Sequence, residues 1–289
     1  MSVTITTAHV QQYRRNIQIK YQQAGSVLRP AVRIENTDAK YHYFDLLAPT
    51  AAIKNVGRHA DTPLVNSQHE RRRAEMCDFD WADLVDQQDR VRMLIEPEGS
   101  YVINAVNAMG RSMDELIIEA FDADAIEGET GATVVPFNAA DFSIGGAGVP
   151  MSVDLLRQTK RIMDDADIPA GDRHIALRPR ALEQLLGETE ITSSDFNTVK
   201  ALVQGDINTF LGFMFHMVSP NVLQSSQAAG RFDSFAWHMR SMGLVTGKDV
   251  SVDIGPRRDK RNSQQVYVCM VMGAVRIEDG VVRIDVDEA

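Results

Sequence analysis

The sequence predicts an α+β protein, and three patterns in its 289 residues support this fold class. Apolar side chains recur at helical spacing over residues 97–124, which predicts one long amphipathic helix. Between residues 151 and 250, helical patterns alternate with short strand-like runs, which is typical of an α/β region. From residue 251 onward the chain returns to runs that favour strands. Those strands need a helix over one face, and the long helix is the expected cover.

Composition and charge limit the classes of protein that fit. With 44% hydrophobic and 24% charged residues, the chain is typical of a soluble protein of one or two domains. It contains no run of 18 apolar residues, and MSVTITTAHVQQYRR lacks the apolar core of a signal peptide, so we expect neither membrane span nor secretion. The formal net charge of -10 argues against a general nucleic-acid binder. Cys77 and Cys269 have no metal-site spacing, and we expect two buried thiols.

The first segments predict appendages to a core. Val10, Tyr13, Ile17 and Tyr21 have helical spacing, so we expect a short basic helix from Ala8 to Gln23. Two strand-like runs, Lys40 to Leu47 and Arg71 to Trp81, then flank a long polar middle and predict an extended hairpin. Its basic residues suggest an arm that reaches an acidic surface, with a solvated loop as the alternative. These residues are Lys54, Arg58, Arg71, Arg72 and Arg73.

An acidic stretch, residues 78–96, precedes the long helix. Pro97 suits the first helical position, and Glu96 and Glu98 suit the positive end of the helix dipole. The expected buried face contains Val102, Val106, Met109, Met113, Leu116 or Ile117, and Ala120 or Phe121. Residues 1–35 are mainly basic whereas residues 75–98 are mainly acidic, which indicates either complementary surfaces on neighbouring copies or two solvated faces.

After the helix, a glycine-rich segment ending at Pro150 predicts a connection between domains, with Gly145, Gly146 and Gly148 as a flexible joint. The next expected elements are helices at Ser152 to Ala166, Pro179 to Leu186 and from Ser193 to Val203, and strands at His174 to Leu177 and Gly212 to Val218. Three C-terminal strands follow, at Ser251 to Ile254, Gln265 to Arg276 and Val281 to Val286. Asp279-Gly280 predicts a tight hairpin between the last two.

Catalytic and ligand-binding motifs are absent from the sequence. GLVTGK, residues 243–248, has one residue too few for a phosphate loop, and Asp249 replaces the required hydroxyl. Asp122 and Asp124 begin like a calcium loop, but Ile126 and Glu127 do not continue it. No two histidines have the i, i+4 spacing of a helical zinc site, and no serine lies in G-x-S-x-G. We therefore expect no enzyme, no cofactor and no metal site.

Two long stretches before and within the predicted spine helix are QHERRR and FDWADLVDQQDRVRMLIEPEGSYVINAVNAMGRSMDELIIEA. They resemble the hairpin and spine helix of the major capsid proteins of tailed bacteriophages of the Hong Kong 97 type. Later similarities are LRPRALEQLLGETEITSSDFNTVKALVQGDINTFLGF, FAWHMRSMGLVTGKDV and QVYVCMVMGAVRIEDGVV. The resemblance runs from about residue 30 onward, and none of these stretches is a catalytic motif.

The resemblance implies a Hong Kong 97-type capsid fold with four parts. They are an N-terminal arm, residues 1–35; an extended loop, residues 36–82; a peripheral domain with spine helix 97–124, residues 83–150 and 251–289; and an axial domain, residues 151–250. It also implies hexamers and pentamers that form an icosahedral shell around double-stranded DNA. The loop would lie on an adjacent subunit, with Lys54, Arg58, Arg71, Arg72 and Arg73 as contact residues and Asp83, Asp86 and Asp89 as partners.

Further partners and rival functions follow from the same resemblance. The short N-terminal arm leads us to expect a separate scaffolding protein, together with a portal protein, non-specific contact with packaged DNA, and assembly of the virion in the host cytoplasm. Some relatives join subunits through lysine to asparagine bonds; Lys54 is the candidate lysine, without an identified acceptor. The alternatives are an encapsulin-like compartment, which would enclose protein cargo, and a soluble α/β enzyme.

Overall fold

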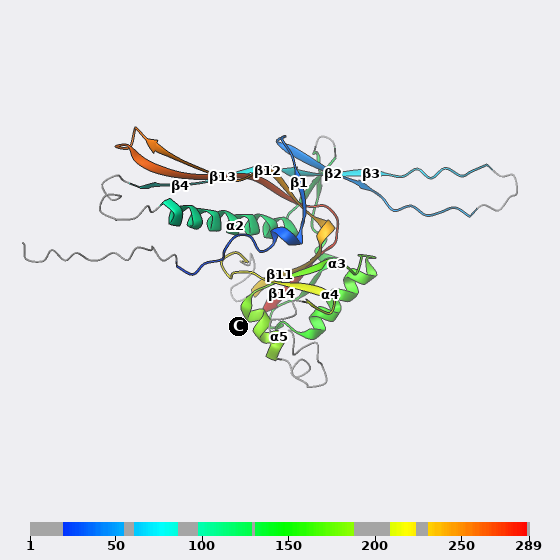
Figure 1. The fold of residues 1–289 in the computed structure, drawn as a ribbon. Helices are drawn as coiled ribbons and strands as arrows, with labels where there is room; N and C mark the ends of the chain where they lie inside the picture. The colour runs from blue at the N-terminus through cyan, green and yellow to red at the C-terminus, as the bar shows by residue number, and fades with distance from the viewer. Residues whose placement is uncertain are drawn as a thin grey trace, which may run out of the picture.

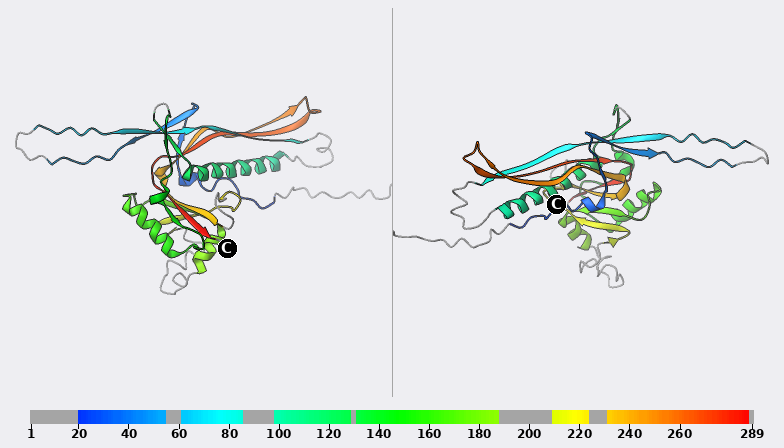
Figure 2. Two further views of the ribbon diagram at one scale, coloured as in Figure 1. Left: turned by 180° about the vertical axis from the view of Figure 1, so that it is seen from behind. Right: turned by 45° about the horizontal axis from the view of Figure 1, so that its top comes forward.

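The computed structural model describes residues 20–54, 61–85, 98–128, 131–187, 209–223 and 231–287. One long helix lies between a four-stranded sheet and a compact module of helices and strands (Figure 1). A two-stranded hairpin projects from one end of this body, and the ribbon formed by the longest strands projects from the other (Figures 1 and 2). The described parts thus confirm the α+β class and give the molecule an elongated shape.

The long helix, α2, spans Glu98–Asp122, so the predicted spine helix is confirmed and is two residues shorter at its C-terminal end. Pro97 lies outside the described residues. The side chains at the centre of the buried face are Ala105, Met109, Met113, Ile117 and Phe121, each at most 3% exposed. They repeat every four residues, which gives one continuous apolar stripe along the helix.

The sheet above α2 has the strand order β1, β12, β13, β4. Its strands are β1 Arg33–Asn36, β4 Cys77–Val85, β12 Met242–Arg257 and β13 Ser263–Arg276. Val266, Val268, Met270 and Met272 alternate along β13 and join the core of α2. The expected cover of these strands by the spine helix is therefore confirmed, although β12 is much longer than the predicted strand at 251–254.

The predicted hairpin forms, but its second run divides into two strands. Antiparallel strands β2 Tyr41–Leu47 and β3 His69–Glu75 pair from Tyr41 with Glu75 to Leu47 with His69. Two short strands, β5 Ala125–Glu127 and β6 Thr133–Val135, extend this second sheet. Met76 separates β3 from β4, and its amide donates to the Lys40 carbonyl across 3.2 Å. The chain therefore passes from the hairpin sheet to the spine-covered sheet at this residue.

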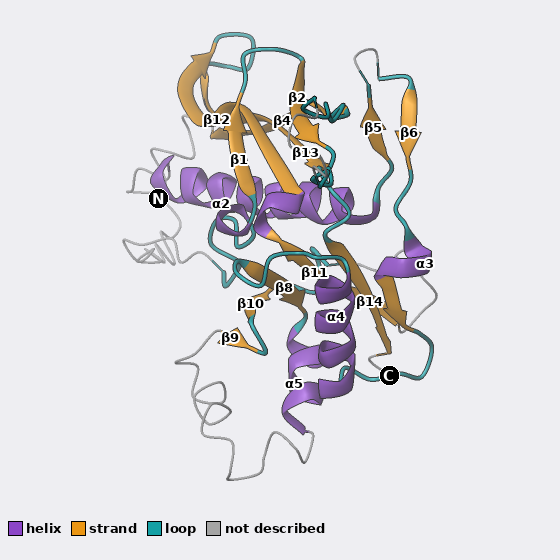
Figure 3. Cartoon of the chain, turned by 90° about the vertical axis from the view of Figure 1, so that its right-hand side faces the viewer, coloured by secondary structure: helices purple, strands orange, loops and turns teal. Residues whose placement is uncertain are grey.

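The third sheet has the strand order β7, β14, β11, β8, β10, β9. Its strands are β7 Ser143–Gly145, β8 Arg173–Leu177, β9 Thr209–Phe210, β10 Phe213–Met217, β11 Arg231–His238 and β14 Val281–Asp287. Helices α3 Ala139–Phe142, α4 Val153–Asp165 and α5 Pro179–Gly187 accompany it. Figure 3 shows α4 and α5 together on one side of these strands. Short 3-10 turns, η1 Arg29–Ala31 and η2 Met239–Ser241, complete the described elements.

The third sheet is buried on both faces. Ile175, Leu177 and Ala236 face a core shared with α4 and α5, whereas Phe235 and Trp237 face the core of α2. Ser152 caps α4 by accepting from the Leu155 amide at 3.3 Å, as its position before the helix leads one to expect. The predictions of helices near α4 and α5 and of strands near β8 and β10 are confirmed.

The predicted C-terminal hairpin is wrong. Instead of pairing with β13, β14 pairs with β11 and β7 in the third sheet. The turn at Asp279-Gly280 changes sheet because Gly280 lies against Ser241, where an added Cβ would come within 1.9 Å of the Ser241 Oγ. The amide of Ile277 also donates to the Ser241 carbonyl at 2.8 Å and directs the chain away from β13.

Three local predictions also fail. Cys77 is exposed because it begins an edge strand, whereas Cys269 is buried as predicted. Gly145 is not a joint, since it lies in β7 so close to Asp285 that a Cβ would come within 2.0 Å of the Asp285 carbonyl oxygen. Residues 20–23 are not helical. The rest of the helix predicted from Ala8, and the helix predicted from Ser193 to Val203, lie outside the described residues.

Candidate functional site

The basic residues of the hairpin have different environments. Arg71 is exposed, and its Nε donates to Asp45 Oδ1 at 2.6 Å across the hairpin. Arg72 is buried; it donates to Glu127 Oε2 at 3.1 Å and to the Ile277 carbonyl at 3.2 Å. The guanidinium of Arg73 lies 4.5 Å from the centre of the Tyr41 ring. All three side chains therefore already have contacts in their own chain, and Arg72 anchors the hairpin to the body.

Replacement of Arg72 with alanine is expected to lower the free energy of unfolding by about 1–3 kcal/mol, because the buried Ile277 carbonyl loses its donor. The matched control is Arg71→Ala, which removes an exposed ion pair and a contact 6.0 Å from the centre of the Tyr43 ring, and should cost less than about 1 kcal/mol. Chemical denaturation of both variants measures the difference. Equal losses would contradict the anchoring role of Arg72.

The outer part of the hairpin exposes apolar side chains as well as charge. Lys54 is exposed, and Arg58 lies outside the described residues. Leu47, Ile53 and Leu64 have 61%, 57% and 94% of their surface exposed. In the isolated chain these apolar side chains stay in contact with water. Their exposure together on a projecting ribbon indicates a surface that another molecule covers.

The structure does not bring the expected acidic partners to the hairpin within one chain. Asp83 lies on β4, where it pairs in register with Val266 of the spine-covered sheet. Its carboxylate accepts the neighbouring Leu84 amide at 2.8 Å. Asp86 and Asp89 lie outside the described residues. Any contact between Asp83 and the basic hairpin residues therefore requires a second copy.

A clamp that sequence reasoning missed holds residues 22–28 against α2. The Asp114 carboxylate, which is fully buried, accepts from the Ser26 hydroxyl at 2.5 Å and from the amides of Val27 at 3.0 Å and Leu28 at 3.1 Å. The Gln23 side-chain amide donates to the same carboxylate. We call this set the arm clamp. The only sequence signal for it is an acidic residue on the apolar face of the predicted helix.

Gly110 allows the arm clamp to form. The backbone of Gly25 crosses α2 so closely that a Cβ on Gly110 would lie 2.3 Å from the Gly25 carbonyl carbon. The following segment then enters the core, where Leu28 and Ala31 are fully buried. These residues therefore belong structurally to the body and not to a projecting arm.

Arg29 extends the same contact to β12. Its guanidinium donates to both carboxylate oxygens of Asp249, at 3.1 and 2.8 Å. The hydrogen bonds from Arg29 lower the pKa of the Asp249 carboxyl. Asp249, which replaces the hydroxyl residue of a phosphate loop in the sequence, is therefore the ion-pair partner of Arg29.

Aromatic rings connect the spine helix to the third sheet. Trp237 is fully buried, its Nε1 donates to the Ala31 carbonyl at 2.8 Å, and its ring centre lies 4.7 Å from that of Phe121. On the other side lie His174 and His216, whose Nδ1 and Nε2 atoms are 2.9 Å apart. Burial, with a smaller contribution from His216, lowers the pKa of His174 to about 4. This junction joins α2, the residues before β1 and the third sheet.

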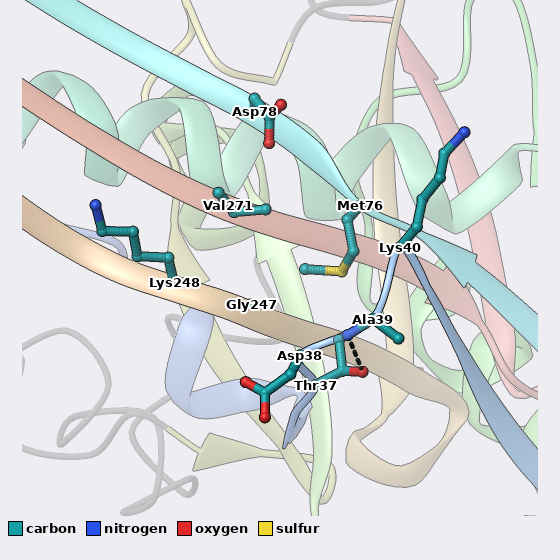
Figure 4. A pocket seen from close by; sticks show the side chains of 9 residues that line it. All are labelled: Thr37, Asp38, Ala39, Lys40, Met76, Asp78, Gly247, Lys248 and Val271. Atoms are coloured by element: carbon teal, nitrogen blue, oxygen red, sulfur yellow. Dashed lines mark hydrogen bonds between the residues drawn. The ribbon is translucent and has the colours of Figure 1, made fainter.

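The Cys269 thiol lies among polar side chains of the spine-covered sheet. Hydrogen bonds with Ser251 and Lys248 lower the pKa of the Cys269 thiol. The Cys269 Sγ lies 3.1 Å from the Ser251 Oγ and 3.2 Å from the Lys248 Nζ. An open hollow of about 500 Å³ lies nearby. Figure 4 shows the amino groups of Lys40 and Lys248 pointing to opposite sides of it. In the described ranges, no group of three metal-binding side chains is present and no helix is long and apolar enough to cross a membrane.

Comparisons with known proteins agree on one family. The family model described as phage capsid protein matches residues 5–288. No curated protein sequence matches the chain. Among solved structures, the acid-stable capsid of the Helicobacter pylori bacteriophage KHP30 is 10% identical, with all of both chains covered and a TM-score of 0.73. The capsid of the cyanophage P-SCSP1u is 14% identical, with 96% of this chain and 94% of that chain covered and a TM-score of 0.71. The capsid of Ralstonia phage GP4 is 12% identical, with 99% and 98% covered and a TM-score of 0.70.

Proposed function

The chain belongs to the phage capsid protein family, and on that premise we propose that it assembles as hexamers and pentamers into an icosahedral shell around double-stranded DNA. It is a major capsid protein, a structural component of the virion whose fold matches capsid proteins over its whole length. The observation that carries the assembly proposal is the projecting hairpin, since its exposed apolar side chains have no cover in the isolated chain. The role is structural, without catalysis.

The parts of the molecule divide naturally for this role. We propose that the sheet of β1, β12, β13 and β4 with α2 forms the peripheral domain, and that β2 and β3 with residues 48–54 and 61–68 form the extended loop. The third sheet with α4 and α5 forms the axial domain, and β14 is part of it because it pairs with β11. The arm ends before Gln22, where the chain contacts α2.

The set of loop residues that we propose as contacts is smaller than the set that the sequence suggests. Lys54 and the exposed Leu47, Ile53 and Leu64 are free to lie on an adjacent subunit. Arg71 can exchange its exposed pair with Asp45 for a partner's carboxylate, because exposed ion pairs are weak. Arg72 supports the loop from inside its own chain. Further proposed partners are a separate scaffolding protein, a portal protein and packaged DNA that is contacted non-specifically, with assembly in the host cytoplasm.

Negative-stain microscopy and solution mass of the purified full chain, expressed alone and with a candidate scaffolding protein, test the proposal. Closed shells of regular size are the expected result, and their formation only with the second protein would support a scaffold. Particles that contain a co-purifying enzyme and no DNA would instead favour a cellular compartment. A small oligomer under all conditions would contradict the shell. Monomer bands from mature particles on a denaturing gel would exclude a covalent link through Lys54.

A further inference from the structure

The turn between β12 and β13 is strongly basic in an acidic protein. Residues 257–262, which we call the basic turn, contain four basic side chains and one acidic side chain, whereas the whole chain has a net charge of -10. All six residues are exposed. The ribbon of β12 and β13 carries this turn to the end of the molecule opposite the β2 and β3 hairpin (Figures 1 and 2). The position and charge indicate a contact with an acidic partner.

Half of the basic side chains in this turn have no partner in their own chain. Arg257 pairs with Asp259 at 2.8 Å and donates to Gln265, and Lys260 also acts electrostatically on Asp259. In the described part of the chain, the side chains of Arg258 and Arg261 make no hydrogen bond or ion pair. The basic turn therefore differs from the hairpin, where Arg71 and Arg72 already have carboxylate partners.

The backbone of the basic turn is well defined. The Lys260 amide donates to the Arg257 carbonyl at 3.1 Å, and the Ser263 amide donates to the Lys260 carbonyl at 2.9 Å. Arg261 and Asn262 have φ values of 50° and 62°, in the left-handed region used by tight turns. Because the backbone is already ordered, a partner need immobilise only the side chains, which reduces the entropy cost of binding.

The acidic complement lies on the edge strand of the same sheet. β4 carries Asp78, Asp80 and Asp83 and no basic residue, and it has a strand neighbour on one side only. Asp78 and Asp80 are exposed and Asp83 is half-buried. Charged side chains on an edge strand oppose backbone pairing with another strand. They leave instead an anionic surface that a cationic group can approach.

We propose that the basic turn of one subunit docks on the acidic β4 strand of a second copy of the chain. The proposal rests on the shell-forming function. It adds a contact between copies that the ribbon of β12 and β13 makes, beside the contact expected for the hairpin. Each copy offers a cationic turn and an anionic strand as two neighbouring but separate surfaces, because Val85 at the end of β4 pairs with Gln264 just after the turn. A contact between the turn of one copy and the strand of another is therefore heterologous and can close a ring of copies around a rotation axis. Leu84, Val252 and Ile254, which are 44%, 42% and 40% exposed, provide apolar surface near the same end.

A second copy fits these observations better than nucleic acid does. The few cations of the basic turn, on a chain of net charge -10, release few counterions from phosphates, and repulsion by the rest of the protein opposes binding. The chain itself supplies a strand with three carboxylates that the single copy leaves without basic partners among its described residues. Charge complementarity therefore favours contact between copies.

Charge reversal of both surfaces tests the proposal in the full chain. The variant R258E/R261E should reduce the fraction of protein in shells at least about tenfold, measured by sedimentation and negative stain. The matched control K160E/R161E makes the same change in net charge on the exposed face of α4 and should assemble normally. Adding D80R and D83R to R258E/R261E in one chain should restore assembly, because every contact between copies then has opposite charges again.

The outcomes separate this contact from the shell proposal itself. If the unaltered chain forms shells and R258E/R261E forms them equally well, the contact is wrong while the shell remains. The same holds if the fourfold variant stays unassembled although its circular dichroism matches that of the unaltered chain. Normal shells that retain less DNA would identify nucleic acid as the partner of the basic turn. The neutral variant R258Q/R261Q, which adds no new charge, should give a smaller loss of assembly.

Discussion

Replacement of Asp114 with alanine is expected to lower the free energy of unfolding by about 3–5 kcal/mol. The buried carboxylate accepts hydrogen bonds from the Ser26 hydroxyl, from the amides of Val27 and Leu28, and from the Gln23 side chain. Alanine leaves these donors without their fully buried acceptor, and the Leu28 amide among them is itself buried. Because backbone amides cannot turn away as side chains can, the segment before β1 must detach from α2 or keep unpaired amides.

Chemical denaturation measures this loss, and limited proteolysis shows whether residues 20–28 detach. Glu115→Ala is the matched control, since it removes an exposed carboxylate from the adjacent position of the same helix. Asp114→Asn should have an intermediate effect because the amide keeps one acceptor oxygen but adds a donor that faces other donors. A loss in Asp114→Ala no greater than that in Glu115→Ala would contradict the arm clamp.

The arm clamp also changes which part of the chain can move during assembly. Leu28, Ala31 and Val32 are at most 1% exposed and belong to the core of α2. An arm that changes its angle must therefore turn before Gln22, and residues 22–35 must move with the body. The division of the sequence at residue 35 came from the resemblance, which gives the order of the parts but not the residue at which the arm meets the body.

Local patterns predicted the elements whose burial follows a simple period. The stripe along α2 and the short apolar strand near Ile175 depend on neighbouring residues alone, and both were predicted. Pairing between strands that are far apart in the sequence was not predicted correctly. The residues of Val281–Asp287 suit a strand in either sheet, and only the pairing with β11 places this strand in the third sheet. The role of Asp114 was likewise invisible, since its donors lie 86 to 91 residues away.

The sequence alone was enough to predict a capsid protein, but it predicted the contact residues only in part. Clustered charge identified Arg71, Arg72 and Arg73, yet charge alone does not show that a guanidinium such as that of Arg72 is buried against a carbonyl. The basic turn at 257–262 was not predicted to be a contact surface, because a run of charge between two strands is usual for an exposed turn. A contact became an argument only when the structure showed an acidic strand beside the turn and no partner for Arg258 and Arg261 in the described part of the chain.

Acid is expected to weaken the junction around Trp237 through His174. Burial, with smaller contributions from the nearby His216 and His238, lowers the pKa of His174 to about 4 in the folded protein, while Asp172 acts in the opposite direction. In the unfolded chain a histidine titrates near 6.5. Between these values the unfolded chain binds a proton that the folded chain does not, so stability falls as the pH decreases from 6.5 to 4. The loss from His174 alone is about 3 kcal/mol across this window, and no loss is expected above it.

The measurement is the free energy of unfolding of the full chain at pH 7.5, 5.5 and 4.5, compared with that of His174→Gln. Glutamine does not titrate, so the difference between the two proteins should shrink as the pH falls, whereas the carboxylates common to both contribute equally. His69→Gln is the matched control, because it makes the same substitution at an exposed position on β3, away from the junction. Since the junction holds α2, Ala31 and the third sheet together, a parallel pH dependence in His174→Gln and the unaltered chain would show that acid acts elsewhere in the molecule.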